Sequence, residues 1–179
     1  GQYMFIDLVP GDYSVQVDPG FLHVVSPMDR GNDTMDSDFD PNTNTSAPIT
    51  LGANENNMTL DVGLFIPATI GNQVWIDIPG DPSNVFGSGD LPVEGLTVNL
   101  YDANTNQVVQ SVQTGNNGSY LFSNLVPGSY FVEFIIPSGY SFVTPNIGND
   151  DAIDSDADQI TGRTHVVDLL SGGLDLTLD

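Results

Sequence analysis

Two five-residue segments of the chain place a carboxylate at every second position. Residues 36–40 read Asp-Ser-Asp-Phe-Asp, and residues 154–158 read Asp-Ser-Asp-Ala-Asp. This spacing lets one short loop turn several oxygens toward a single point, as the first ligands of calcium-binding loops do at relative positions 1, 3 and 5. The two segments therefore predict oxygen-lined sites for a hard divalent cation, with calcium as the expected ion.

The two acidic segments belong to a longer internal repeat. Residues 1–5 match residues 118–122, and residues 8–15 match residues 125–132 in the same order. Recurrence over such a length indicates tandem modules. The sequence therefore predicts about one and a half modules. We expect residues 1–66 to form the C-terminal half of a module, residues 67–70 a short linker, and residues 71–179 a nearly complete module.

A half module would have unpaired strand edges and an open core. Two sources of the missing strands stay open at this point. They could come from upstream residues of a longer array, or from another subunit that adds its strands across an interface. The expected partners are therefore neighbouring modules of the same chain or other subunits.

Negative charge dominates the composition. The formal net charge is −22, with 24 acidic residues against two arginines, and the chain has no lysine and no cysteine. Phosphate contacts need Lys and Arg, so we expect no binding to nucleic acid. No apolar run is long enough for a membrane-spanning helix, so we expect no membrane insertion. The acids cluster in Gly- and Asn-rich stretches, which favours metal-binding loops over a merely solvated acidic surface.

Short runs of β-branched and aromatic residues alternate with turn residues along the chain. Examples are residues 73–76, 96–101, 119–122 and 130–134, several of which alternate apolar with polar positions. Such alternation is typical of strands with one buried face, and no amphipathic helix is evident. Many short strands separated by regular turns predict an all-β sandwich or barrel.

As an ordered set, these motifs resemble the B-repeat domains of serine-aspartate repeat surface proteins, which are related to the prealbumin-like B-type modules of collagen adhesins. The resemblance is carried by residues 71–77 (Gly-Asn-Gln-Val-Trp-Ile-Asp), 91–102, 118–130 and 150–158, and by the closing residues 175–179. It implies tandem Ig-like, prealbumin-type β-sandwich modules that bind calcium and are strung along an extracellular or cell-surface bacterial protein.

The resemblance also implies a site in the first loop, where the family carries an acidic run after Trp-x-Asp. Here that loop contains Asp77 and Asp81, but Pro79 stands where an acid or Asn is expected. Asp102 is expected at the same end of the sandwich. For each aspartate, the alternative is a turn residue that caps its own backbone. The candidate metal ligands are Asp33, Asp36, Asp38, Asp40, Asp77, Asp81, Asp102, Asp150, Asp154, Asp156 and Asp158.

These features favour a non-catalytic module, a calcium-stabilised spacer of an extracellular rod, stalk or filament. The alternative is an adhesin or a carbohydrate- or protein-binding module, for which the segment from Pro79 to Pro92 is the longest candidate loop. An enzyme is not expected. The sequence has no nucleophile elbow and no phosphate loop. The paired aspartates recur module by module, as a structural feature would, rather than once as in a two-carboxylate glycosidase.

Overall fold

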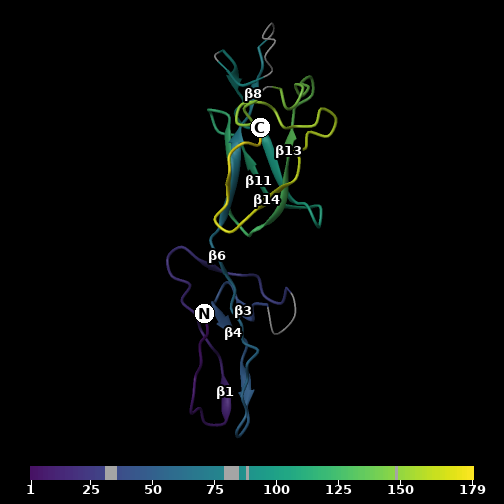
Figure 1. Cartoon of the computed structure of the whole chain (residues 1–179). Coiled ribbons are helices and arrows are strands. Elements are labelled where there is room, and N and C mark those ends of the chain that lie inside the picture. Colours follow the sequence, from purple (N-terminus) through teal and green to yellow (C-terminus); the bar gives the residue numbers. More distant parts are fainter. Residues whose placement is uncertain (31–35, 79–84, 88, 148) are drawn as a thin grey trace. The chain divides into compact units, whose positions relative to one another are not determined.

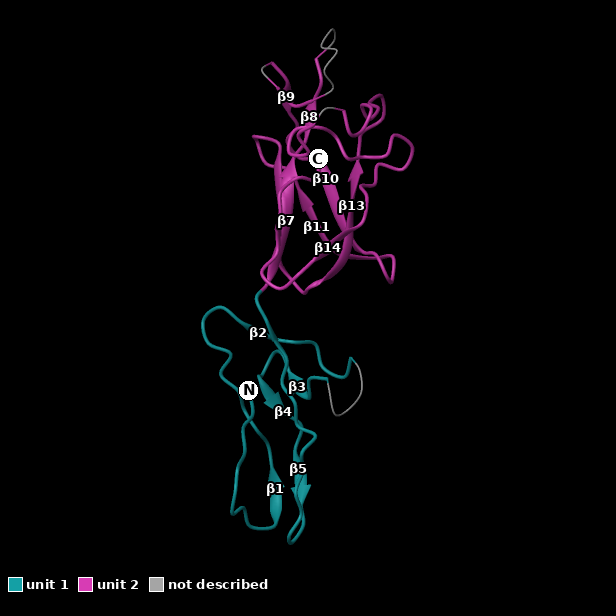
Figure 2. Cartoon of the chain, in the orientation of Figure 1, with its two compact units in different colours: residues 1–66 teal, residues 67–179 magenta. Residues whose placement is uncertain are grey.

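The computed structural model describes residues 1–30, 36–78, 85–87, 89–147 and 149–179. They form two compact units, Gly1–Ile66 and Pro67–Asp179 (Figures 1 and 2). The described residues are strands, turns and loops without a helix, so the predicted all-β class is confirmed. Accordingly, nothing in this described part is a helix of the length and apolarity needed to cross a bilayer.

Unit 2 is a β-sandwich built from two sheets and a short strand pair (Figure 1). Its strands are β7 (Ala68–Gln73), β8 (Trp75–Ile76), β9 (Leu91–Pro92), β10 (Thr97–Asp102), β11 (Gln107–Gln113), β12 (Ser119–Leu125), β13 (Gly128–Ile135), β14 (Val167–Leu169) and β15 (Leu174–Asp175). One sheet has the order β11-β10-β13-β14 and is antiparallel throughout. The other has the order β12-β7-β15, in which β15 runs parallel to β7. Strands β8 and β9 pair separately.

The core of unit 2 lies between these sheets. Strand β12 turns Tyr120 and Phe122 inward and leaves Ser119 and Leu121 exposed, which is the alternation expected of a half-buried strand. Facing residues such as Val98 and Val132 come from the other sheet and are fully buried.

The first strand of unit 2 begins earlier than the sequence indicated. Strand β7 starts at Ala68, inside the segment 67–70 that we expected to be a linker. Ala68 and Ile70 are both fully buried in the core, so packing rather than turn chemistry decides the structure here.

Unit 1 consists of three antiparallel strand pairs. Its strands are β1 (Gly11–Tyr13), β2 (Val24–Val25), β3 (Phe39–Asp40), β4 (Thr45–Ser46), β5 (Ile49–Leu51) and β6 (Leu64–Phe65). They pair as β1-β5, β2-β6 and β3-β4.

Local hydrogen bonds of unit 1 recur in the second half of unit 2. The Tyr13 hydroxyl donates to the Val9 carbonyl at 2.6 Å, and the Tyr130 hydroxyl donates to the Val126 carbonyl at the same distance. The backbone N–H of Val15 donates to the Ser46 hydroxyl at 3.0 Å, as that of Val132 does to Thr164. Unit 1 therefore repeats local hydrogen bonds of residues 118–179.

Among its described residues, unit 1 has no strands that cover its apolar face as the core strands of unit 2 cover theirs. Tyr120 and Phe122 are 4% and 0% exposed, whereas their counterparts Tyr3 and Phe5 are 47% and 61% exposed. In unit 2 the cover comes from strands β7 and β10. The same residue types are thus core in one unit and surface in the other.

This contrast predicts unequal costs for one substitution. Phe122→Ala should lower the free energy of unfolding of unit 2 by about 3–5 kcal/mol, because it removes a fully buried ring. The matched Phe5→Ala change should cost less than about 0.5 kcal/mol, because that ring is mostly in water. Urea unfolding, followed by Trp75 fluorescence for unit 2 and circular dichroism for unit 1, checks both values. Equal losses would contradict the assignment.

Candidate metal centre

The loop before and within the second acidic segment brings three carboxylates together. Oxygens of Asp151, Asp154 and Asp156 lie within 4.8 Å of one another. Two backbone interactions shape the loop. The N–H of Ile153 donates to the Asp150 carbonyl at 3.2 Å, and Asp154 forms an isolated antiparallel bridge with Val85. The alternating spacing thus places Asp154 and Asp156 on one side of the loop.

Asp179 joins this cluster from the end of the module. Its backbone N–H donates to Oδ2 of Asp156 at 3.3 Å, and its carbonyl accepts from the N–H of Asp156 at 2.7 Å. Asn72 of β7 donates from Nδ2 to Oδ2 of Asp179 at 2.8 Å and to the Ala152 carbonyl at 3.4 Å. Three segments that are distant in the sequence therefore meet at this point.

Three of these carboxylates are buried, and each has one oxygen that accepts no hydrogen bond from the described residues. Asp154, Asp156 and Asp179 are each 5% exposed, and Oδ1 of each accepts no hydrogen bond from the described residues. His165 is the nearby basic group, with Nδ1 3.5 Å from Oδ1 of Asp156. A buried carboxylate oxygen that accepts no hydrogen bond is costly, so this cluster requires compensation for its charge.

The pKa values reflect this burial and mutual repulsion. Burial raises the pKa of Asp179 to about 9, and the charges of Asp156, Asp154 and Asp151 add to the effect. Burial also raises the pKa of Asp156 to about 6, although the bond from the backbone of Asp179 lowers it in part. The pKa of Asp154 is raised as well, by burial and by Asp151 and Asp150. A divalent cation would reverse each of these penalties.

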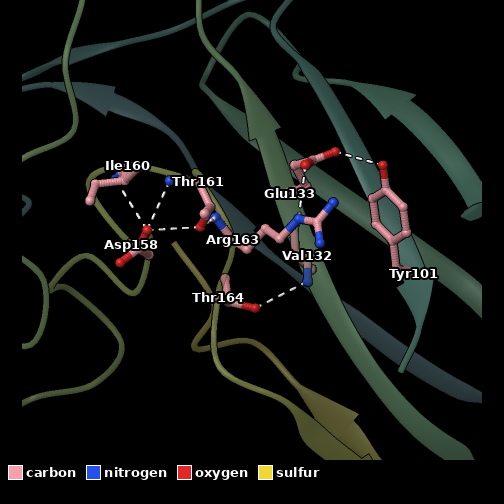
Figure 3. A network of polar contacts seen from close by, with 8 residues as sticks. All are labelled: Tyr101, Val132, Glu133, Asp158, Ile160, Thr161, Arg163 and Thr164. Atoms are coloured by element: carbon pink, nitrogen blue, oxygen red, sulfur yellow. Dashed lines mark hydrogen bonds and ion pairs between the residues drawn. The ribbon is translucent and has the colours of Figure 1, made fainter. Parts of the chain in front are cut away.

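Three other predicted ligands cap turns. Asp158 accepts hydrogen bonds at Oδ1 from the backbone N–H groups of Ile160 (3.1 Å) and Thr161 (2.8 Å), and from the Thr161 hydroxyl (Figure 3). Asp102 accepts in the same way from Asn104 and Thr105, and Asp40 accepts from Asn42. These bonds lower the pKa of Asp158, which is the opposite of the shift at the buried cluster. Asp40, Asp102 and Asp158 therefore have the geometry of turn-capping residues, which was the alternative to metal ligation.

Arg163 is engaged away from the cluster. Its Nε lies 2.9 Å from Oε1 of Glu133, whose other oxygen accepts from the Tyr101 hydroxyl at 2.6 Å (Figure 3). The guanidinium also lies 5.1 Å from the ring centroids of Tyr101 and Phe131, which are stacked. This arginine therefore stabilises the outer side of the β10-β13 pair and does not neutralise the buried aspartates.

The remaining predicted ligands lie near the cluster or outside the described residues. Asp150 accepts from the N–H of Ala152 at 3.3 Å and acts on Asp154 through its charge. Asp77, directly after β8, lines the same groove as Asp179 but is not part of the three-carboxylate group. Asp33 and Asp81 fall outside the described residues.

Comparison with known proteins identifies the family to which this chain belongs. The family described as SdrD B-like domain matches residues 1–64 and 68–179. The chain belongs to the SdrD B-like domain family. It is 34% identical over 164 residues to serine-aspartate repeat-containing protein D of Staphylococcus aureus strain Newman, a match that covers 90% of this chain and 12% of that protein.

Two further relatives extend this comparison. Serine-aspartate repeat-containing protein I of Staphylococcus saprophyticus is 35% identical over 149 residues, which cover 80% of this chain and 8% of that protein. Among solved structures, the minor pilin GBS52 of Streptococcus agalactiae aligns with a TM-score of 0.41 at 12% identity, covering 74% of this chain and 57% of that one. That alignment is too weak to add to the argument. The chain thus spans a small part of its full-length relatives.

The first of the two SdrD B-like repeats retains half of the cluster. The N–H of Asp61 donates to Oδ2 of Asp38 at 2.6 Å, and the N–H of Asp38 donates to the Asp61 carbonyl at 2.9 Å. These are the Asp156–Asp179 bonds in the earlier repeat. Asp36 and Asp38 are only half-buried, and the described residues of unit 1 include no strand that corresponds to β7 with its Asn72. The acidic segment is thus anchored identically in both units but enclosed in one.

The set of predicted ligands did not include four residues of this cluster, of which Asp151 had been considered as a weaker candidate. Asp179 was detectable, because the closing residues 58–61 and 176–179 repeat with an aspartate at the end. Asp151 has no counterpart in unit 1, so the repeat gave no signal for it. Asn72 reaches the cluster from strand β7, and His165 reaches it from the segment before β14. No local sequence pattern marks either residue.

The raised pKa values predict the pH dependence of the metal-free protein. Folding raises the pKa of Asp156 and Asp179 above the unfolded value of 3.8, so the folded state holds these protons more tightly. The resulting stability is present at low pH and is lost as the pH rises through about 6 and then about 9. We expect the melting temperature of unit 2 in EDTA to fall from about pH 5 to about pH 9.

The Asp179→Asn variant is the control for this prediction. Asn cannot titrate, so the variant should lose the part of the slope between about pH 7 and about pH 9. Thermal melts followed by Trp75 fluorescence supply the measurement. A wild-type melting temperature that rises over this interval, or a variant that keeps the full slope, would contradict the assignment.

Proposed function

We propose that this chain is a calcium-stabilised structural spacer from an extracellular rod, stalk or filament. The observation that carries the proposal is the group of buried oxygens on Asp154, Asp156 and Asp179 that accept no hydrogen bond from the described residues. Together with Asp151, these residues offer carboxylate oxygens from a loop and from the end of the module. A cation bound there would fasten the loop to the end of the sandwich.

Calcium suits this donor set better than other cations. The ligands are all oxygen, which suits a hard cation, and calcium accepts six to eight oxygens in irregular geometry. Magnesium requires a near-ideal octahedron and keeps several waters. Zinc prefers nitrogen or sulfur ligands, and the chain has no cysteine. Binding to the folded form alone would add about 2.7 kcal/mol of stability at a hundredfold excess over Kd.

Membership of the SdrD B-like domain family supports a structural role at the cell surface. The matched relatives are much longer than this chain and are named for their serine-aspartate repeats. Hydrogen bonds from Asp179 and Asn72 link the acidic loop to the end of the module and to β7, as expected of a site that stabilises the fold. The described part offers little support for the adhesin alternative: Trp75, the aromatic residue best suited to stacking on a sugar, is half-buried, with its ring centroid 5.6 Å from that of Phe86.

Two Asp→Asn substitutions, each of which removes one negative charge, test the calcium proposal. Asp154→Asn removes a buried charge whose Oδ1 has no hydrogen-bond donor, so it should weaken calcium binding at least about tenfold, equivalent to about 1.4 kcal/mol. Asp158→Asn is the matched control, because Asn can still cap the exposed turn and the residue lies outside the cluster. Titration calorimetry on chelator-treated protein measures both affinities.

Thermal melts should agree with the calorimetry. Calcium should raise the melting temperature of unit 2 in the wild type and in Asp158→Asn, and less in Asp154→Asn at the same concentration. An absence of heat and of any thermal shift in the wild type would refute the calcium proposal. An equal loss in both variants would place the ion elsewhere.

A further inference from the structure

A groove of about 570 Å³ opens on the surface of unit 2. Its lining includes Trp75, Val93, Phe134, Phe142 and Asp179. One wall is the segment 141–143, and another is formed by β8 and Asp77. The lining is mainly apolar, so water in this groove covers surface that a folded module would normally bury.

Unit 1 has a strand at the corresponding place. In the repeat, Val24 and Val25 of β2 correspond to residues 141 and 142 of unit 2. Strand β2 pairs with β6 in antiparallel register, Val24 with Phe65 and Val25 with Leu64. The N–H of the next residue, Ser26, donates to the Gly63 carbonyl at 2.8 Å. Of these four residues, Val25 and Phe65 are buried, whereas Val24 and Leu64 are exposed.

The equivalent segment of unit 2 has no such partner. The described residues supply no backbone–backbone hydrogen bond to Ser141, Phe142 or Val143. Phe142 is only partly buried, unlike its counterpart Val25. Because Asp61 corresponds to Asp179, the equivalent of β6 would come directly after Asp179.

We propose that this groove is the docking site of a β-strand that continues the chain directly after Asp179 and has the apolar-glycine-apolar-aromatic pattern of residues 62–65. The strand would pair antiparallel with residues 141–143. It would place its aromatic residue opposite Ser141, as Phe65 lies opposite Val24.

The geometry and charge of the groove specify this occupant. Asp179 itself lines the groove, so a strand that follows it enters without an intervening loop. Asp77 and Glu94 also line it, which disfavours an acidic segment and favours an uncharged one. The glycine matters because a Cβ at Gly63 would lie 2.7 Å from Oγ of Ser26, so the strand approaches its neighbour closely.

The test extends the full chain by six residues after Asp179, copied from residues 62–67 (Val-Gly-Leu-Phe-Ile-Pro). A matched extension carries Asn in place of its Leu and Phe. In EDTA, the first extension should raise the melting temperature of unit 2 and shift the emission of Trp75 to shorter wavelength. It should also slow amide exchange at Ser141 and Val143 at least tenfold, because the N–H groups of their counterparts in β2 are the ones that face β6. The Asn-containing extension should do none of these.

A cross-link fixes the register, because the natural chain has no cysteine. Ser141→Cys combined with a cysteine at the fourth added position should form an intramolecular disulfide, since directly opposed residues of antiparallel strands lie within its reach. With the cysteine at the third position, the bond should form at least tenfold more slowly. Equal effects of the two extensions, equal cross-linking at both positions, or cross-links formed only between molecules would overturn the proposal. Because EDTA is present throughout, the result is independent of calcium binding.

Discussion

The closing aspartate of each unit is joined to the acidic segment by two reciprocal hydrogen bonds. In unit 2 the pair is Asp156 with Asp179, and in unit 1 it is Asp38 with Asp61. Each pair fastens the end of the module to a loop more than 20 residues earlier in the sequence. The bonds satisfy backbone groups at the strand end, but they do so by holding carboxylates side by side. Every other feature of the cluster follows from that arrangement.

Holding these carboxylates together is unfavourable unless something compensates for their charge. Two unit charges 4 Å apart repel by about 1 kcal/mol in water and by about 4 kcal/mol at an effective dielectric constant of 20. Arg163 is committed to Glu133 and two aromatic rings, and His165 reaches a single oxygen of Asp156. Compensation therefore comes from protons or from a cation. The raised pKa values describe the first solution, and the proposed calcium the second.

The sequence predicted the class of fold, the repeat and the loop that forms the cluster, because each depends on local patterns. Alternation in residues 119–122 marks a half-buried strand, and the repeated Asp-Ser-Asp marks the loop. It could not separate the buried Asp154 and Asp156 from the turn-capping Asp158, because all three share one spacing. The difference arises from long-range contacts: Asp179, itself held by Asn72, bonds to Asp156 beside Asp154, whereas Thr161 bonds to Asp158 within a local turn.

The same long-range logic connects the cluster with the edge of the module. Asp179 is both a member of the carboxylate group and a lining residue of the apolar groove. In unit 1, the residue after its counterpart Asp61 leads into β6, and the chain then passes through Pro67 into β7. One continuous segment thus supplies an acidic anchor, an edge strand of one module and the first core strand of the next. Because the anchor and the strand are continuous, the proposed ion and the proposed strand would act on the same end of the sandwich.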